Sequence, residues 1–422
     1  MIKFTPIRGT VDILPEEIVY WQKVENCAKT ILKLANYEEI RTPIIEYTDL
    51  FIRTIGKNTD IVNKEMYNFQ DLSNRNITLR PEGTAGVMRA YIYNNMANSK
   101  KNIHKLWYCG PMFRYERPQM GRKRQFHQFG IEVIGSSDVR AEVEIIMIVH
   151  DILKELNIDN LELHVNSIGN ILDRSNYEKI LTQYLLKYIA DLDDDSKKRI
   201  YTNPIRILDS KNYKTQQILS TGPNIRDYLS NNSKEQFTEF LKYLESLDIN
   251  YVINDKLVRG LDYYTNTAFE IKITNNESSE STICGGGRYD MLGTELSDNF
   301  IPAVGCAIGI ERLVNILSKN NNKNIENCDF YIAANGQFAL SKSLKVARIL
   351  RQYKFVTNLD LSKSKFSHQI KKAKDINAKA CIFIGDEEYI NECLLIKWLD
   401  TFKQENISDN DLIKYLKNLR NK

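Results

Sequence analysis

One polar segment, residues 318–327, constrains the fold of this chain more than any other feature, because it separates two stretches that each need a hydrophobic core. Its sequence, SKNNNKNIEN, is rich in asparagine and has no hydrophobic periodicity, as is typical of a linker. The chain has 422 residues, which is more than a single compact core usually supports. We therefore predict a large domain over 1–317, a linker over 318–327 and a small domain over 328–422.

The small domain shows alternating strand-like and helix-like segments. Strand patterns lie at 329–334, 356–360, 381–385 and 393–398, and helix patterns lie at 341–353, 368–378 and 411–420. This order predicts an α/β domain with a mixed, largely parallel sheet. The domain has 17 Lys and Arg against 11 Asp and Glu, which favours a polyanionic partner, although basic residues also serve solubility.

The large domain combines a few strands with many helices. A long amphipathic helix is predicted over 16–36, followed by a strand over 39–46, in which Pro43 favours an edge or interface position. Two strands over 106–114 and 126–135 enclose a cation-rich loop, and we predict an antiparallel pair with a functional tip. Further patterns predict a helix over 143–157, a strand over 161–165, a mostly helical insertion over about 175–250, strands around Ile271 and Ile283, and a helix from about Gly309.

Composition excludes several classes of protein. The seven cysteines contain no CxxC pair, which argues against a disulfide framework or a thiolate zinc site. No run approaches the ~20 apolar residues of a membrane span, and the N-terminus lacks a signal-peptide core. We therefore expect a cytoplasmic protein without a membrane partner. The histidines lack metal-ligand spacing, so we predict no metal on protein side chains; His127 is expected to be a packing or hydrogen-bonding residue.

Candidate chemistry rests on arginines, since the glycine run at 285–287 lacks the Lys-Ser/Thr of a phosphate-binding P-loop. Arg114, Arg259 and Arg312 lie in three distant segments, and a guanidinium offers the planar bidentate contacts that suit phosphate. The residues alone leave open whether the three share a phosphate pocket or are ordinary surface arginines. Likewise, Thr84 either binds a ligand or caps the helix that follows it.

Three segments, taken in order, resemble the motifs of class II aminoacyl-tRNA synthetases: 37–46 with its proline, 113–126, and 305–313 with Glu311 and Arg312. A fourth segment, 257–264, contains Arg259 together with a carboxylate and two tyrosines. This segment and 80–84 resemble segments of the histidyl-tRNA synthetase family, which the chain resembles nearly from end to end. The resemblance implies an α+β fold with an antiparallel sheet flanked by helices, a helical insertion and a C-terminal α/β anticodon-binding domain. It also implies a homodimer.

The resemblance further implies ATP-dependent attachment of L-histidine to tRNA(His) through a histidyl-adenylate, with Mg²⁺ carried by ATP. The implied catalytic residues are Arg259, Arg114 and Arg312, the first two on the α-phosphate and substrate carboxylate and the third on the γ-phosphate. The implied histidine-binding residues are Glu82, Gly83, Thr84, Arg114, Gln128, Glu132, Arg259, Tyr263 and Tyr264. The implied ATP-binding residues are Arg114, Glu116, Arg122, Phe126 and Arg312. The implied tRNA-binding residues are Arg117, Gln119 and Arg124.

These residue types suit histidine. A neutral imidazole offers one donor and one acceptor, so Glu132 can accept from the ring N–H while a tyrosine hydroxyl meets the other nitrogen. Such a site leaves polar groups unpaired against an apolar competitor, which gives discrimination of up to ~10⁴-fold without editing.

Other functions stay open at this point. One alternative is a non-catalytic relative that acts as the regulatory subunit of ATP phosphoribosyltransferase; such relatives typically lose motif residues and the anticodon-binding domain. Threonyl, prolyl and glycyl enzymes share the motifs but not the 259–264 segment. A plain RNA-binding module explains the basic C-terminal domain but leaves the three arginines without a role.

Overall fold

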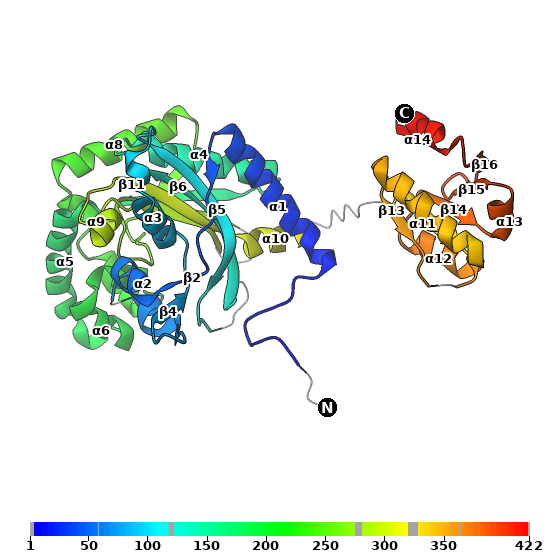
Figure 1. The fold of residues 1–422 in the computed structure, drawn as a ribbon. Coiled ribbons are helices and arrows are strands. Elements are labelled where there is room, and N and C mark those ends of the chain that lie inside the picture. The colour runs from blue at the N-terminus through cyan, green and yellow to red at the C-terminus, as the bar shows by residue number, and fades with distance from the viewer. Residues whose placement is uncertain are drawn as a thin grey trace. The chain divides into compact units, whose positions relative to one another are not determined.

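The computed structural model describes residues 4–57, 59–117, 122–274, 281–319, 328–362 and 364–420. The chain divides into two compact units, Met1–Asn322 and Lys323–Lys422, which are described separately (Figure 1). This division falls inside the predicted linker, although helix α10 (Ile310–Lys319) continues two residues into it. Within the described ranges, no helix is long and apolar enough to cross a membrane.

The first unit is built on an eight-stranded sheet with the order β1-β5-β6-β11-β10-β9-β7-β8. Its strands are β1 (Glu38–Glu39), β5 (His104–Phe113), β6 (Gln125–Ile134), β7 (Leu161–Ser167), β8 (Tyr251–Ile253), β9 (Thr265–Ile273), β10 (Ser281–Arg288) and β11 (Ala303–Gly309). Adjacent strands from β5 to β7 in this order are antiparallel, and only the edge strands β1 and β8 pair in parallel. The predicted antiparallel pair over 106–114 and 126–135 is confirmed as β5 and β6.

The predicted strand over 39–46 is wrong as a single element. Its start, β1, pairs with β5, whereas its end, β2 (Ile45–Tyr47), joins β4 (Asn76–Leu79) and β3 (Tyr67–Gln70) in a separate small sheet. The backbone N–H of Ile40 donates to the Trp107 carbonyl at the end of the first pairing, and the residues between Ile40 and Ile45 lie in neither sheet. Pro43 lies in this gap, where its missing N–H interrupts no ladder.

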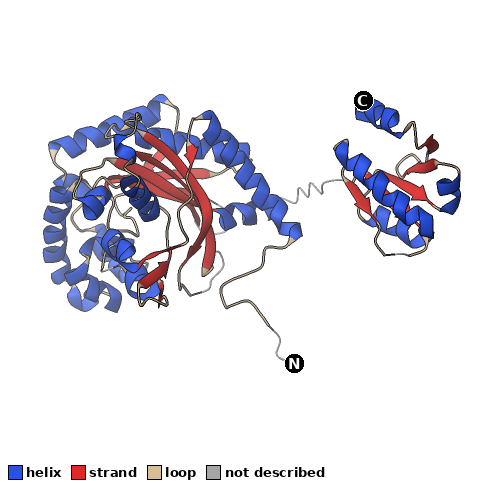
Figure 2. Cartoon of the chain, in the orientation of Figure 1, coloured by secondary structure: helices blue, strands red, loops and turns tan. Residues whose placement is uncertain are grey.

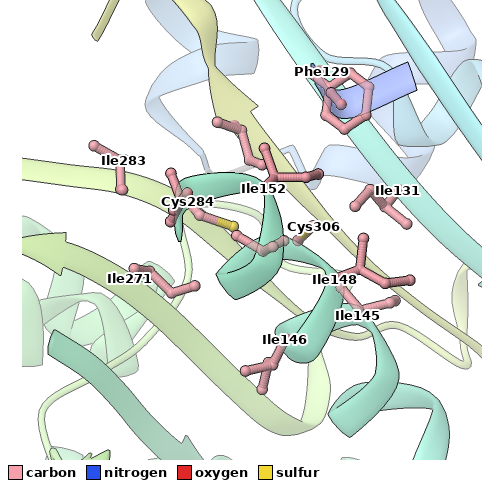
Figure 3. Packing of buried hydrophobic residues seen from close by; sticks show 14 of the residues in the cluster. Phe129, Ile131, Ile145, Ile146, Ile148, Ile152, Ile271, Ile283, Cys284 and Cys306 are labelled. Atoms are coloured by element: carbon pink, nitrogen blue, oxygen red, sulfur yellow. The ribbon is translucent and has the colours of Figure 1, made fainter. Parts of the chain in front are cut away.

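Helices cover the back face of the large sheet. These are α1 (Pro15–Leu34), α4 (Arg140–Glu155) and α10, whose apolar residues belong to one cluster with those of the central strands (Figure 2). Ile148 of α4, for example, packs in this cluster with Ile131 of β6 and Cys306 of β11 (Figure 3). The smaller helices of this unit are α2 (Thr48–Ile55), α3 (Thr84–Tyr93) and α9 (Leu292–Ser297), with short helical turns η1 (Ile61–Glu65) and η2 (Met96–Asn98).

The segment between β7 and β8 is helical, as predicted. It contains α5 (Ile171–Leu186), α6 (Asp194–Thr202), α7 (Tyr213–Ser220) and α8 (Asn231–Ser246), joined by the turns η3 (Ile189–Asp191), η4 (Pro204–Asp209) and η5 (Ile225–Tyr228). Apolar residues of this insertion share one hydrophobic cluster with Tyr263, Tyr264 and Tyr289. Helices α5 and α6 of the insertion therefore share a core with the 257–264 segment, whereas α8 belongs to the back-face cluster.

The second unit contains a five-stranded mixed sheet with the order β13-β12-β14-β15-β16. Its elements are β12 (Phe330–Ala334), α11 (Gln337–Gln352), β13 (Thr357–Leu359), α12 (Phe366–Asp375), β14 (Ala380–Ile384), α13 (Asp386–Ile390), β15 (Cys393–Trp398), β16 (Gln404–Ser408) and α14 (Leu412–Arg420). The first three strands in this order pair in parallel and the last two pairings are antiparallel. The sequence does not predict β16, because only one of its five residues, Ile407, is apolar.

Candidate active site

The front face of the large sheet, opposite the helices α1, α4 and α10, carries the candidate site. Along β6, Glu132 and Gln128 alternate with the buried back-face residues Phe129 and Ile131, so the two polar residues project from the same face. Their partners on β11 are glycines: Gly305 lies opposite Glu132, and Gly309 lies opposite Gln128. Glycine inside a strand gives up packing and marks a close approach by another group. On the front face, β11 therefore has no side chain at the two positions opposite Glu132 and Gln128.

Glu132 is the centre of this group. Its carboxyl is fully buried and accepts hydrogen bonds from the Thr84 hydroxyl, at 2.7 Å, and from the Tyr289 hydroxyl. A Cβ on Gly305 would lie 1.6 Å from a carboxyl oxygen of Glu132, so only glycine fits there. Burial raises the pKa of Glu132 to about 8, against the opposing effect of the two hydroxyl donors.

Tyr289 is a site residue that the sequence analysis missed. It lies one residue after the end of β10, is buried, and packs edge-on against the Tyr263 ring with centroids 5.6 Å apart. The available signal was an aromatic residue two positions after the glycine run at 285–287, which pairs through β11 with the part of β6 that carries Glu132.

Residues 82–84 meet the site at the start of α3. The Glu82 carboxylate accepts the backbone N–H groups of Thr84, at 2.6 Å, and Ala85, at 2.9 Å, so Glu82 supplies the side-chain oxygen at this helix end. The idea that Thr84 caps the helix is wrong, since its hydroxyl donates to Glu132 instead. A Cβ on Gly83 would overlap the Tyr108 ring, at 2.2 Å, which explains the glycine. Burial raises the pKa of Glu82.

Arg259 lies across β10. Its guanidinium pairs with Glu270, lies 5.8 Å from the Tyr264 ring centroid, and comes within 2.1 Å of where a Cβ on Gly285 would be. Its Nε is buried without a hydrogen-bond partner among the residues the structure describes. Tyr263 and Tyr264 are buried beside it, and burial raises the pKa of Tyr264 to about 12. The structure therefore brings Arg259 and both tyrosines to the same face as Glu132.

The other cations gather around β5, β6 and α10. Arg114 donates from Nε to the Pro81 carbonyl, at 2.8 Å, and lies over the Phe126 ring, 5.2 Å from its centroid. The Glu116 carboxylate lies 4.0 Å from Arg114 and 3.4 Å from Arg122. Arg312 forms no ion pair with any residue in the described ranges. Burial and the nearby Arg122 both lower the pKa of Arg312. A half-buried arginine that has no ion-pair partner among the described residues is suited to bind an anionic ligand.

The predicted tRNA-contacting residues are only partly placed. Arg117 is exposed, whereas Gln119 lies outside the described residues. Arg124 stacks on the Tyr115 ring, with its guanidinium 3.6 Å from the centroid, and its backbone N–H donates to the Gly9 carbonyl at 2.7 Å. Arg124 thus helps to fix the base of the loop.

His127 and Gln128 have different roles. The backbone N–H of His127 donates to Glu311, at 2.9 Å, and its ring nitrogen Nδ1 lies 3.1 Å from the same carboxylate. His127 is therefore a hydrogen-bonding residue, as predicted, and it ties β6 to the start of α10. Gln128 is half-buried on the site face and has no side-chain hydrogen bond within the described part of the chain. It is free to meet a ligand.

Comparison with known proteins points to one family along the whole chain. The family model described as histidyl-tRNA synthetase matches residues 9–313, and the model described as anticodon binding domain matches residues 329–419. A chloroplastic histidine–tRNA ligase from Pyropia yezoensis is 53% identical over 420 residues, which cover 99% of this chain and 97% of the relative. A histidine–tRNA ligase from Picosynechococcus sp. is 49% identical over 422 residues, which cover 100% of this chain and 99% of the relative.

A solved structure agrees with these relatives. The apo histidyl-tRNA synthetase of S. aureus matches with a TM-score of 0.83 and 37% identity, covering 99% of this chain and 100% of that chain. The predicted fold class, with a helix-flanked antiparallel sheet and a C-terminal α/β anticodon-binding domain, is confirmed. By these matches, this chain belongs to the histidyl-tRNA synthetase family.

Proposed function

We propose that this chain is a histidine–tRNA ligase, which attaches L-histidine to tRNA(His) in two steps. In the first step the histidine carboxylate attacks the α-phosphate of ATP, which gives histidyl-adenylate and pyrophosphate. In the second step the terminal ribose hydroxyl of the tRNA takes the histidyl group and AMP leaves. The single observation that carries the proposal is the buried Glu132, bonded by Thr84 and Tyr289 on the face that also carries Arg259.

Selection of histidine follows from hydrogen bonding. Glu132 accepts the N–H of the imidazole ring, and a neighbouring tyrosine hydroxyl or Gln128 meets the second ring nitrogen. Glu82 and Thr84 bind the α-amino group. Each Glu82 oxygen accepts one backbone N–H and has a further lone pair for an ammonium. An apolar amino acid leaves these buried groups unpaired, so it binds poorly.

Activation needs positioning and charge neutralisation more than proton transfer, because the attacking carboxylate is already ionised. Arg114 and Arg259 grip the α-phosphate and the substrate carboxylate, and Arg312 holds the γ-phosphate. Phe126, Glu116 and Arg122 complete the ATP-binding residues. In the described ranges, no group of three His, Cys, Asp or Glu side chains could hold a metal ion. From the family we infer Mg²⁺ as a companion of ATP; bound to the phosphates, it would add positive charge to them.

The remaining partners are proposed from the family. In this proposal Arg117, Gln119 and Arg124 bind the acceptor end of tRNA(His), the second unit binds the anticodon, and two copies of the chain form a homodimer. The cytoplasmic location stays a prediction, since relatives of this chain include ligases described as chloroplastic.

The regulatory-subunit alternative is not favoured. Relatives about 50% identical over the whole chain are named histidine–tRNA ligases, and the anticodon-binding domain is present. Arg114, Arg259 and Arg312 are also all present in the sequence, which supports the catalytic assignment.

Pyrophosphate exchange tests the proposal directly. We expect ATP–pyrophosphate exchange without tRNA to depend on histidine and on none of the other standard amino acids. Exchange that depends on a different amino acid would contradict the assigned pocket. Absence of exchange from a folded protein would contradict the activity and bring back the regulatory alternative.

A further inference from the structure

The loop that carries Arg259 is held at its C-terminal end by the helical insertion. Arg206 of η4 donates from Nη2 to the Gly260 carbonyl, directly after Arg259, and its Nε lies 3.8 Å from the Asp262 carboxylate. Asn203, at the end of α6, donates to the same carboxylate at 2.9 Å. The backbone conformation on one side of Arg259 is thus set by side chains from a different part of the chain.

A third insertion residue holds Asp262 from another direction. Arg174 of α5 donates from Nη1 to the Asp262 carbonyl, at 2.9 Å, and its Nη2 lies 3.9 Å from the carboxylate. On the opposite side, the Asp262 backbone N–H donates to the Ile55 carbonyl at 3.1 Å. A Cβ on Gly56 would lie 2.3 Å from the Asp262 carboxylate. Asp262 is therefore wedged between the insertion and the end of α2.

The N-terminal end of the same loop is held in the same way. Arg226 of η5 pairs with Asp255 at 2.5 Å, and Asn224 donates to that carboxylate at 2.6 Å. Lys256 donates to the Gln216 side chain of α7 at 2.6 Å. Both ends of the loop over 255–262 are thus attached to the insertion, with Arg259 between them.

The contacts between Arg206 and the loop are largely shielded from solvent, which strengthens them. The side chains of Arg206 and Asp262 are 18% and 24% exposed, and burial lowers the pKa of Arg206, against the attraction of Asp262. Arg259 is half-buried, and its guanidinium pairs with Glu270 of β9, which lies outside the insertion. Burial raises the pKa of Asp209 of η4 and the nearby Arg259 opposes this, but no hydrogen bond or ion pair between Arg259 and the insertion is present among the described residues. The hydrogen bonds and ion pairs of the insertion therefore reach Arg259 through the backbone on either side of it.

We propose that the helical insertion is a positioning device for amino-acid activation, in which Arg206, with Asn203 and Arg174, fixes the Gly260–Asp262 backbone and thereby aims Arg259. This rests on the proposed role of Arg259 at the reacting carboxylate and phosphate. Arg206 is then a positioning residue that touches neither substrate. Misplacing a catalytic group by about 1 Å can cost on the order of 100-fold in rate.

A double-mutant cycle separates this role from a general structural one. The variants are Arg206→Gln, Arg259→Gln and both together, measured by histidine-dependent pyrophosphate exchange. We expect Arg206→Gln alone to lower kcat about 10-fold, with a smaller change in the KM for histidine, because Arg259 acts mainly on charge in the transition state. In the Arg259→Gln background, the same change at Arg206 should have almost no further effect.

Two more variants control the cycle. Arg206→Lys should recover part of the loss, because an ammonium can reach Gly260 or Asp262 but not form both contacts. Arg199→Gln removes a different cation of the insertion, which pairs with Asp60 at 2.7 Å and forms no hydrogen bond or ion pair with 255–262 in the described part of the chain, and it should leave exchange unchanged. Thermal unfolding of each variant shows whether it is folded, and Asn203→Ala replaces Arg206→Gln if the latter is not.

The outcomes are distinct. Equal losses from Arg206→Gln in both backgrounds overturn the inference, because Arg206 then acts independently of Arg259. No loss in the wild-type background overturns it as well. Normal exchange by Arg259→Gln contradicts the proposed role of Arg259 itself, and the inference falls with it. A loss confined to the background that contains Arg259 supports the positioning role.

Discussion

Glu132 shows how one buried carboxyl combines stability and recognition. The site gives it two hydroxyl donors and no cation at hydrogen-bond distance among the described residues. Burial therefore dominates and raises the pKa of Glu132 to about 8, compared with about 4.3 in an unfolded chain. Without ligand, the folded protein holds this proton over a range in which the unfolded chain has released it.

This predicts a pH-dependent stability. Because the pKa of Glu132 is higher in the folded protein than in the unfolded chain, protonation of Glu132 adds to the free energy of unfolding. This contribution is fully present below about pH 4.5 and is lost as the pH rises toward 8. From pH 6 to pH 9 the wild-type protein should lose on the order of 3 kcal/mol relative to Glu132→Gln, which has no proton to release. Thermal unfolding of both proteins across this range, without histidine, measures the difference.

Tyr289→Phe provides the matched variant. It removes a hydrogen bond that favours the ionised carboxylate, so the loss of stability should extend to higher pH than in the wild type. A difference between wild type and Glu132→Gln that does not vary with pH would contradict the assigned ionisation.

At the scale of elements, the central strands have two chemically different faces. The back faces of β6 and β11 carry residues such as Ile131 and Cys306 against α4 (Figure 3). The front face of β11 carries only glycine and alanine. The back face packs in the larger hydrophobic cluster, and front-face residues such as Ile134 and Ala303 belong to a second one. The glycines of the front face leave space for the side chains of Glu132 and Arg259, which lie against the backbone of Gly305 and Gly285.

Gly305→Ala tests this division. Its new Cβ would meet the Glu132 carboxyl and, at 2.8 Å, the Ile131 carbonyl, so Glu132 must move away from its donors. We expect kcat/KM for histidine in pyrophosphate exchange to fall by about 100-fold or more, with the fold retained by the unchanged back face. Gly309→Ala on the same strand is the control, because its Cβ only reaches ordinary contact with the Arg312 stem at 3.9 Å. A normal KM for histidine in Gly305→Ala would rule out Glu132 as the imidazole partner.

Elements were predictable where one residue pattern repeats. The helix over 16–36, the strands over 106–114 and 126–135, and most elements of the second unit follow from hydrophobic periodicity and lie within a few residues of the predictions. Predictions failed where the pattern was interrupted or absent. Pro43 divides one predicted strand between two sheets, and β16 has too few apolar residues to be seen.

At the scale of the whole molecule, the division into two units separates two tasks. Every residue proposed for histidine and ATP lies between Glu82 and Arg312, in the first unit, and the anticodon-binding family model matches only the second. The two tasks should therefore be separable by cutting the chain.

We predict that residues 1–319 alone catalyse histidine-dependent pyrophosphate exchange at near the full-length rate but charge tRNA(His) much more slowly. The loss reflects missing tRNA contacts, and raising the tRNA concentration should recover part of it. The comparison requires that the shortened chain be folded, as judged by its thermal unfolding. Loss of exchange from a folded 1–319 chain would show that the second unit also supports activation.

The sequence by itself determined the two-part organisation, the periodic helices and strands, and the residue types of the site, because these depend on neighbours a few positions apart or on short motifs. Only the tertiary structure decided which polar groups meet. Thr84 could have capped its own helix, but the sheet brings it to Glu132, 48 residues away, and Tyr289 arrives there from 157 residues away. The insertion reaches the Arg259 loop in the same manner. Contacts of this kind join residues that are far apart in the sequence, and the packing of the whole domain decides which residues meet. The local sequence pattern around one residue does not identify its distant partner.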